Sequence, residues 1–243
     1  MKLLIVSLMS AFLIAFGELH PVQADDTTEK PPNVSFGVAG SFNAFSAWER
    51  KKGDQYTGFH LSPGYGGGFI YEKMYNNLLG IYSGIWFNRL SLNIRMKQPL
   101  DPLAYNFPLN LLPMKLTVHG LSVSFPLSLI VSLNTSNFSF NILGGIKYTH
   151  IVESLGRPDN TALSYKKNID ILPYLNQPQF GFTLGINLKF RIATFIDLFL
   201  GCMGNLYVTS LIKGRNDTAL LYDISAVSGV MFRTNIFPMM DKL

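Results

Sequence analysis

The segment Phe138-Ser-Phe-Asn-Ile-Leu-Gly-Gly-Ile-Lys-Tyr-Thr149 decides the fold of this chain. Apolar residues take nearly every second place in it, and small or polar residues fill most of the places between them. A period of two predicts a β-strand with one apolar and one polar face, because successive side chains in a strand point to opposite sides. Several other segments repeat the pattern, and the repeating unit of the chain is a hairpin.

The pattern predicts about eight strands, joined by connections that alternate between short and long. The strands are expected at about residues 34–48, 58–73, 78–94, 115–133, 138–152, 180–189, 192–211 and 221–237. Short connections at 75–77 and 134–137 alternate with long ones at 97–114 and 153–177. This layout is typical of an all-β, closed, antiparallel up-and-down transmembrane β-barrel with short periplasmic turns and longer extracellular loops. A hairpin concealed in 153–177 would raise the strand count to ten.

The N-terminus has the three parts of a secretory signal. Lys2 provides the positive start, Leu3 to Phe16 form an apolar run of about 14 residues, and Val22-Gln23-Ala24 is a cleavage site. A membrane-spanning helix needs about 20 residues, so the run favours a signal over an anchor. We expect a cleaved signal at 1–24, a periplasmic lead-in at 25–32, the barrel domain at 33–238 and a short tail at 239–243.

The composition is unusually apolar for an exported protein without disulfides. Hydrophobic residues make up 48% of the chain and charged residues 14%, and Cys202 is the single cysteine. One cysteine excludes an internal disulfide and any multi-cysteine metal site. An outer-membrane barrel explains the composition, because it spreads apolar residues over its exterior in alternation. A soluble lipocalin-like barrel would need an apolar inward face, whereas this one carries Ser, Asn, Lys, Asp and Arg.

The net charge of +5 and the pI near 9.2 favour an anionic partner. Basic residues cluster at 50–52, 166–167 and 213–215, all in predicted loops. Export argues against nucleic acid, so outer-membrane lipid, lipopolysaccharide or surface polysaccharide are the candidate anions, and a plain solubilising charge on the loops is the favoured interpretation.

Charged residues on the polar faces are the candidate lumen network. They are Glu72, Lys147, Lys189, Asp197, Asp223 and Arg233. An eight-stranded barrel is just wide enough for side chains to fill, and buried charges need partners, so we expect a salt-bridged polar core. Asp197 and Arg233, on adjacent strands at similar heights, are the predicted pair. The alternative is an ion path through a small pore.

Aromatic residues on the apolar faces are the candidate interfacial girdles. They are Tyr65, Tyr71, Phe87, Tyr148, Phe190, Tyr222 and Phe237. Such rings lie at the two membrane–water interfaces of outer-membrane barrels.

His119 and His150 form a further candidate site. The hairpin turn at 134–137 predicts that they lie opposite each other, or two residues out of register, on the apolar face near the outer rim. A metal would need a third ligand, and a hydrolase would need a placed serine and carboxylate. Glu153 and Ser154 fall in the predicted loop. We therefore expect interfacial histidines and no catalytic residue, metal or cofactor, with an outer-leaflet lipid-modifying enzyme as the alternative.

The whole mature chain resembles the outer-membrane β-barrel family that includes the PorT-like proteins. The matching strands are FGVAGSFNAF (36–45), PGYGGGFIYEK (63–73), LSVSFPLSLIV (121–131), NILGGIKYTHI (141–151) and VSGVMFRTNIF (227–237). The resemblance implies an eight-stranded barrel in the outer membrane of a Gram-negative-type bacterium, with few or no catalytic residues. It also implies a role for the loops in adhesion, in ligand binding or in partnership with secretion or envelope proteins.

Overall fold

The computed structural model describes residues 34–49, 56–96, 114–135, 138–158, 169–211 and 219–234. The predicted signal, lead-in and tail, the three basic clusters and Phe237 lie outside the described residues. Within the described ranges, no helix is long and apolar enough to cross a membrane.

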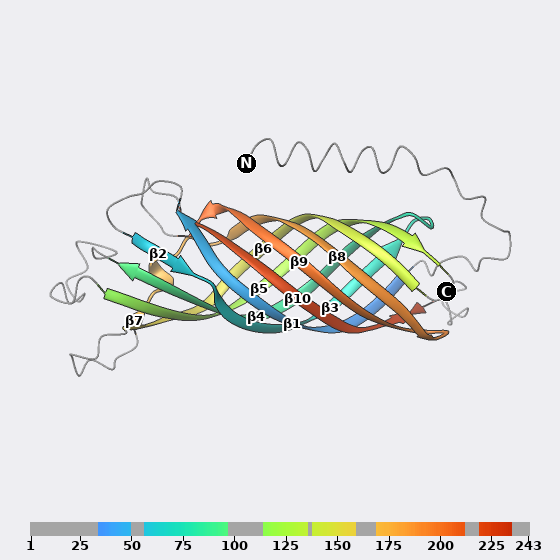
Figure 1. The fold of residues 1–243 in the computed structure, drawn as a ribbon, viewed down its shortest axis with the longest axis horizontal. Coiled ribbons are helices and arrows are strands. Elements are labelled where there is room, and N and C mark those ends of the chain that lie inside the picture. Colours follow the sequence, from blue (N-terminus) through green and yellow to red (C-terminus); the bar gives the residue numbers. More distant parts are fainter. Residues whose placement is uncertain are drawn as a thin grey trace, which may run out of the picture. The chain divides into compact units, whose positions relative to one another are not determined.

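The fold is a closed ring of eight antiparallel strands (Figure 1). The strands are β1 (Val34–Glu49), β3 (Ser62–Met74), β4 (Leu79–Met96), β5 (Met114–Asn134), β6 (Phe138–Pro158), β8 (Gln179–Ala193), β9 (Ile196–Ser210) and β10 (Ala219–Arg233). Each pairs with the next along the chain, and β10 pairs with β1. The predicted all-β up-and-down barrel is confirmed.

Two short strands extend the ring without adding positions to it. β2 (Tyr56–His60) pairs with β4, as β3 does, and only Leu61 separates β2 from β3. β7 (Ile169–Asp170) pairs with β6 and is followed by a 3-10 turn, η2 (Leu172–Tyr174). The described part of the ring therefore has eight positions, not ten.

The predicted start of the longest loop at Glu153 is wrong. A bulge at Leu121/Ser122 of β5 leaves Val152 of β6 without a register partner, and pairing then resumes from Leu121 opposite Glu153. β6 runs on to Pro158 because this single extra residue is absorbed by the bulge and the ladder continues beyond it.

The two ends of the barrel differ. One end carries the tight connections β3–β4, β5–β6 and β8–β9, and we call it the turn end. In the β3–β4 turn the Asn76 side-chain oxygen accepts hydrogen bonds from the backbone N–H groups of Leu78 (2.9 Å) and Leu79 (2.6 Å). This local bond is why an asparagine favours a tight turn. The opposite end carries β2 and β7, at the left of Figure 1, and we call it the loop end.

The strand register fixes the width of the barrel. Paired residues can be followed from Ser122 of β5 through β4, β3, β1, β10, β9, β8 and β6 back to β5 at Ser132, ten residues further along. A stagger of this kind requires strands tilted by about 35–45° to the axis. With eight strands, the interior has room for side chains and little else.

Candidate functional site

The outer surface is an apolar band bounded by aromatic residues. Phe138 pairs with Phe190, and ten residues further along the same two strands Tyr148 pairs with Phe180. Their rings contact each other, with centroids 5.9 Å and 5.3 Å apart. Ten residues of a strand tilted by about 40° rise by about 25 Å, which matches the apolar band of a transmembrane barrel.

The structure places the described candidate girdle residues in two rings. Tyr71 and Phe190 lie three residues from the turn end of their strands, and we call their ring the lower girdle. The second ring, the upper girdle, lies eight to eleven residues from the turn end. Its predicted members are Tyr65, Phe87, Tyr148 and Tyr222. Phe125 packs on Tyr148 and joins the upper girdle, and Phe36 packs on Tyr71 and joins the lower one.

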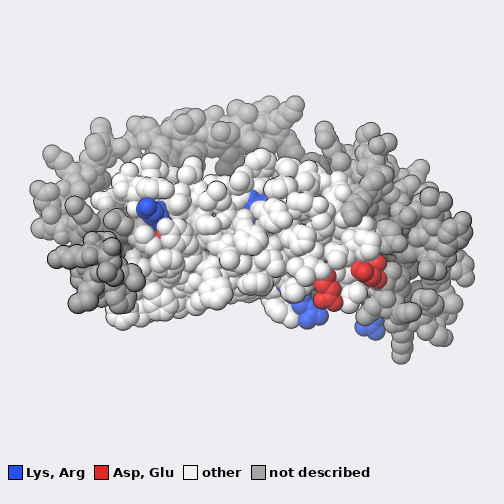
Figure 2. Space-filling view, turned by 180° about the vertical axis from the view of Figure 1, so that it is seen from behind, with Lys and Arg blue, Asp and Glu red and all other residues white. Residues whose placement is uncertain are grey.

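Charge is absent from the described outward positions between the girdles. Those positions carry exposed leucine, isoleucine, valine and phenylalanine, such as Leu129, Ile146 and Leu184. Figure 2 shows a broad white middle on one face, with charged side chains mainly toward the ends. Such a surface needs an apolar solvent.

Ion pairs fill the lumen near the turn end. Arg233 donates through Nε to Asp197 Oδ2 at 2.7 Å and through Nη2 to Asp197 Oδ1. The two residues lie on neighbouring strands, as the predicted pair requires. Lys189 contacts both carboxylate oxygens of Glu72.

The Glu72–Lys189 pair crosses the barrel. Glu72 lies on β3 and Lys189 on β8, and these strands are four positions apart in either direction around the ring of eight. Glu72 is 3% exposed and Lys189 is 11% exposed. An ion pair that joins opposite walls occupies the lumen itself.

An apolar layer lies next to these ion pairs, on the side toward the loop end. Its buried members are Ile70, Tyr82, Trp86, Ile130, Leu143, Phe199, Val227 and Met231. This layer interrupts the expected polar core, because its positions have inward parity but carry large apolar or aromatic side chains. The layer separates the ion pairs near the turn end from the polar groups above it.

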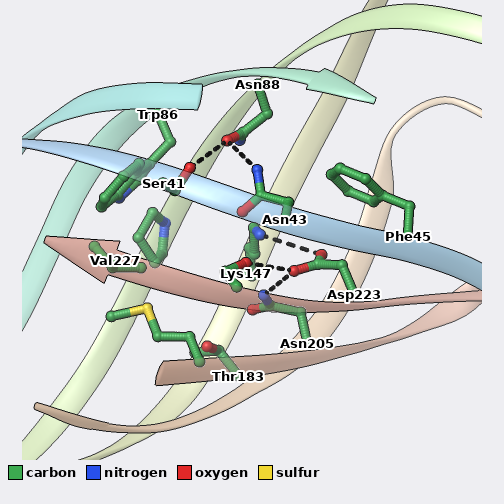
Figure 3. A pocket seen from close by; sticks show the side chains of 13 residues that line it. Ser41, Asn43, Phe45, Trp86, Asn88, Lys147, Thr183, Asn205, Asp223 and Val227 are labelled. Atoms are coloured by element: carbon green, nitrogen blue, oxygen red, sulfur yellow. Dashed lines mark hydrogen bonds and ion pairs between the residues drawn. The ribbon is translucent and has the colours of Figure 1, made fainter. Parts of the chain in front are cut away.

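A second polar layer surrounds Asp223, which is almost fully buried (Figure 3). Lys147 Nζ lies 3.5 Å from Asp223 Oδ2, and Tyr207 donates to the same oxygen at 3.3 Å. Asn205 and Ser225 donate to Asp223 Oδ1 at 2.6 Å and 3.0 Å. A buried carboxylate tolerates desolvation only with such partners.

An amide cluster on β1 and β4 belongs to the same polar layer and depends on a glycine. Asn88 Oδ1 accepts hydrogen bonds from Asn43 (3.2 Å) and Ser41 (3.4 Å), which lie two strands away (Figure 3). Gly66 occupies the strand between them, and a Cβ there would lie 2.1 Å from Asn88 Oδ1. Glycine at this position lets the Asn88 side chain reach over β3.

The polar layer leaves little empty space. The residues lining its cavity, of about 30 Å³, include Ser41, Asn43 and Asn88 of the amide cluster together with Lys147 and Asp223. A volume of that size has room for about one water molecule.

A segment that follows β7 packs against the barrel at the loop end. Ile171, Leu175 and Leu211 are buried there, with exposures of 2%, 4% and 0%. The Gln177 side chain accepts from the Ile151 N–H at 3.0 Å and donates to the Ile151 carbonyl at 3.1 Å. This pair of bonds holds the segment to β6 at the point where the bulge disturbs the ladder.

The two histidines do not form a site. Both are exposed on the outer face, as their parity predicts. However, His119 pairs with Leu155 and His150 pairs with Val123, so they are four residues out of register along β5. The predicted offset of zero or two residues is wrong, because the hairpin pairs Asn134 with Ser139, and this register places Val123 opposite His150. Four residues span about 13 Å, too far for a shared metal or proton. Among the described residues, no group of His, Cys, Asp or Glu could hold a metal ion.

The sequence analysis missed part of the lumen. It did not identify Tyr207, Asn205 or the Asn43–Asn88 cluster, although their parity on the polar face marked them as inward. Inward parity would also have identified the apolar layer at Trp86 and Leu143.

The fold defines a closed eight-stranded antiparallel barrel with an apolar exterior, and solved structures of such barrels are similar to it. OprG from Pseudomonas aeruginosa, an outer membrane protein, is 10% identical over 83% of this chain and 96% of that one, with a TM-score of 0.46. Neisserial surface protein A is 10% identical over 82% and 96%, with a TM-score of 0.43. Ail from Yersinia pestis, solved with the heparin analogue sucrose octasulfate, is 9% identical over 82% and 99%, with a TM-score of 0.42. No protein-family model matches the chain, and no curated protein matches it either.

Proposed function

We propose that this chain is a non-enzymatic integral outer-membrane protein whose lumen is filled and whose activity resides at its loop end. The observation that carries the proposal is the Glu72–Lys189 pair, which joins opposite walls of the barrel beneath an apolar layer. A channel needs a continuous hydrated path, and these two features occupy it.

The apolar band supports the membrane location. Its height of about 25 Å between aromatic girdles equals that of outer-membrane barrels, in which short turns face the periplasm and longer loops face outward. In that orientation the upper girdle lies at the outer leaflet. Outer-membrane lipid and lipopolysaccharide are then the surrounding partners.

The PorT-like resemblance favours a role as an accessory to a secretion or envelope complex over adhesion. The loops at 99–114 and 153–177 remain the proposed contact surfaces, now with the second beginning after Pro158. The lipid-modifying alternative loses support from the offset between His119 and His150.

Two measurements test the proposal. Protein extracted from an outer-membrane fraction in detergent should migrate differently on a gel before and after boiling, because closed barrels stay folded until heated. Purified protein in a planar bilayer should give no conductance steps. Recovery in the soluble fraction without a gel shift would refute the membrane location. Stable conductance steps would refute the filled lumen.

A further inference from the structure

Arg89 is a charged residue on the outer surface, at the edge of the apolar band. It lies on β4, ten residues from the turn end at Leu79, and its exposed side chain belongs to the outward face. Its register partners are Tyr65 of β3 and Leu121 of β5, both exposed. Arg89 therefore stands at the height of the upper girdle, at the boundary of the apolar band.

The guanidinium of Arg89 contacts Tyr65, and it forms no ion pair with a carboxylate among the described residues. Nη1 donates to the Tyr65 hydroxyl at 3.0 Å, and the guanidinium carbon lies 5.8 Å from the centre of the Tyr65 ring. Within the described ranges, no Asp or Glu lies within ion-pair distance of Arg89. The six lumen charges, by contrast, are all paired with each other. A guanidinium has five N–H donors, and within the described ranges one of those of Arg89 has a hydrogen-bond partner.

The surroundings fit an anion at this height. His119 is a diagonal neighbour of Arg89 on β5, and it is exposed. The nearest carboxylate in the same row is Glu153 of β6, two strands away, or about 10 Å. A cation at the edge of an apolar band is stabilised when it meets the phosphate layer of the lipid.

We propose that Arg89, oriented by Tyr65, binds the phosphate of a lipid in the outer leaflet. This inference rests on the proposed membrane location and orientation. The guanidinium group can donate to two phosphate oxygens at once. Tyr65 orients it by accepting a hydrogen bond through its hydroxyl and by contact with its ring. The apolar side chains below, such as Phe87, would contact the acyl chains of the same lipid.

The barrel offers a matched control at the opposite girdle. Lys73 is also an outward cation beside a tyrosine, with Nζ 5.6 Å from the centre of the Tyr75 ring, but it lies at the turn end. In the proposed orientation Lys73 faces the inner leaflet. Replacing it removes the same charge from the exterior without touching the Arg89 site.

The experiment measures binding of fluorescent diphosphoryl lipid A to the full chain in detergent micelles. Wild type, Arg89→Gln and Lys73→Gln are each first required to show heat-modifiable mobility, which tests the barrel separately from the site. We expect Arg89→Gln to weaken binding at least about five-fold and Lys73→Gln to leave it unchanged. Dephosphorylated lipid A should bind wild type and Arg89→Gln equally, and millimolar inorganic phosphate should not compete.

Three outcomes would overturn the inference. Equal affinity of wild type and Arg89→Gln for diphosphoryl lipid A would show that Arg89 is not part of a site. An equal loss of affinity in Lys73→Gln would show that the effect comes from net charge and not from a site at Arg89. Competition by inorganic phosphate would show that the site binds free phosphate rather than the phosphate of a lipid. Loss of heat-modifiable mobility in wild type would instead refute the proposed function itself.

Discussion

Replacing Lys189 with methionine should destabilise the barrel by an amount that depends on pH. The change leaves Glu72, 3% exposed, without its partner on the opposite wall. Breaking a buried ion pair from one side costs about 3–5 kcal/mol. Glu72 can avoid this penalty by taking up a proton, so the cost of protonation sets an upper limit on the loss of stability.

The limit follows from the cost of protonation. Protonating an ordinary aqueous glutamate costs about 3.7 kcal/mol at pH 7 and about 1 kcal/mol at pH 5. Lys189→Met should therefore lose about 3–4 kcal/mol at pH 7 and about 1 kcal/mol at pH 5. The difference from wild type shrinks as the pH falls, because the neutral carboxyl needs no cation.

A double variant, Glu72→Gln with Lys189→Met, is the control. It removes both charges, so its stability should lie within about 1 kcal/mol of wild type and vary little with pH. Urea unfolding in lipid vesicles, followed by the fluorescence of buried Trp86, measures all three proteins. A Lys189→Met loss below about 0.5 kcal/mol at pH 7, or a loss equal to that of the double variant, would refute the cross-lumen pair.

Three further outcomes are expected. Gly66→Ala should cost about 1–3 kcal/mol, because the new Cβ would lie 2.1 Å from Asn88 Oδ1. Gly40→Ala should be neutral, because a Cβ there would lie 3.9 Å from the Gly66 carbonyl oxygen, and urea unfolding compares the two variants. Gln177→Ala should cost about 1–2 kcal/mol and speed hydrogen exchange at the Ile151 amide, and unchanged exchange there would contradict the role of this side chain. The double variant should remain silent in a planar bilayer, since the apolar layer still fills the lumen; conductance steps would show that the ion pair alone closes it.

Strand parity could be predicted from the sequence because it depends only on neighbouring residues. In β6, Phe138 and Ile146 face outward and Asn141 and Thr149 face inward, as the alternation predicts. The Asp197–Arg233 contact followed from the same logic, since both residues lie close to the turn end of adjacent strands.

Register and partners across the lumen could not be predicted in this way. The offset between His119 and His150 depends on which residues the hairpin turn pairs, and the alternation does not encode that pairing. The partner of Glu72 depends on which strands face each other across the ring, and that requires the strand count and the closure. Inward parity marks Trp86 and Leu143 as lumen residues, but it does not show that their side chains meet in one apolar layer, because these residues come from different strands.

The long-range position of the Glu72–Lys189 pair has a consequence for assembly. The two residues are 117 positions apart in the chain, and the ring closes only when β1 meets β10. We expect this contact to form late, after β3 and β8 have come to face each other. A mutation at Glu72 or Lys189 should then slow the final step of insertion more than the early pairing of hairpins, and sheets that have not closed should accumulate.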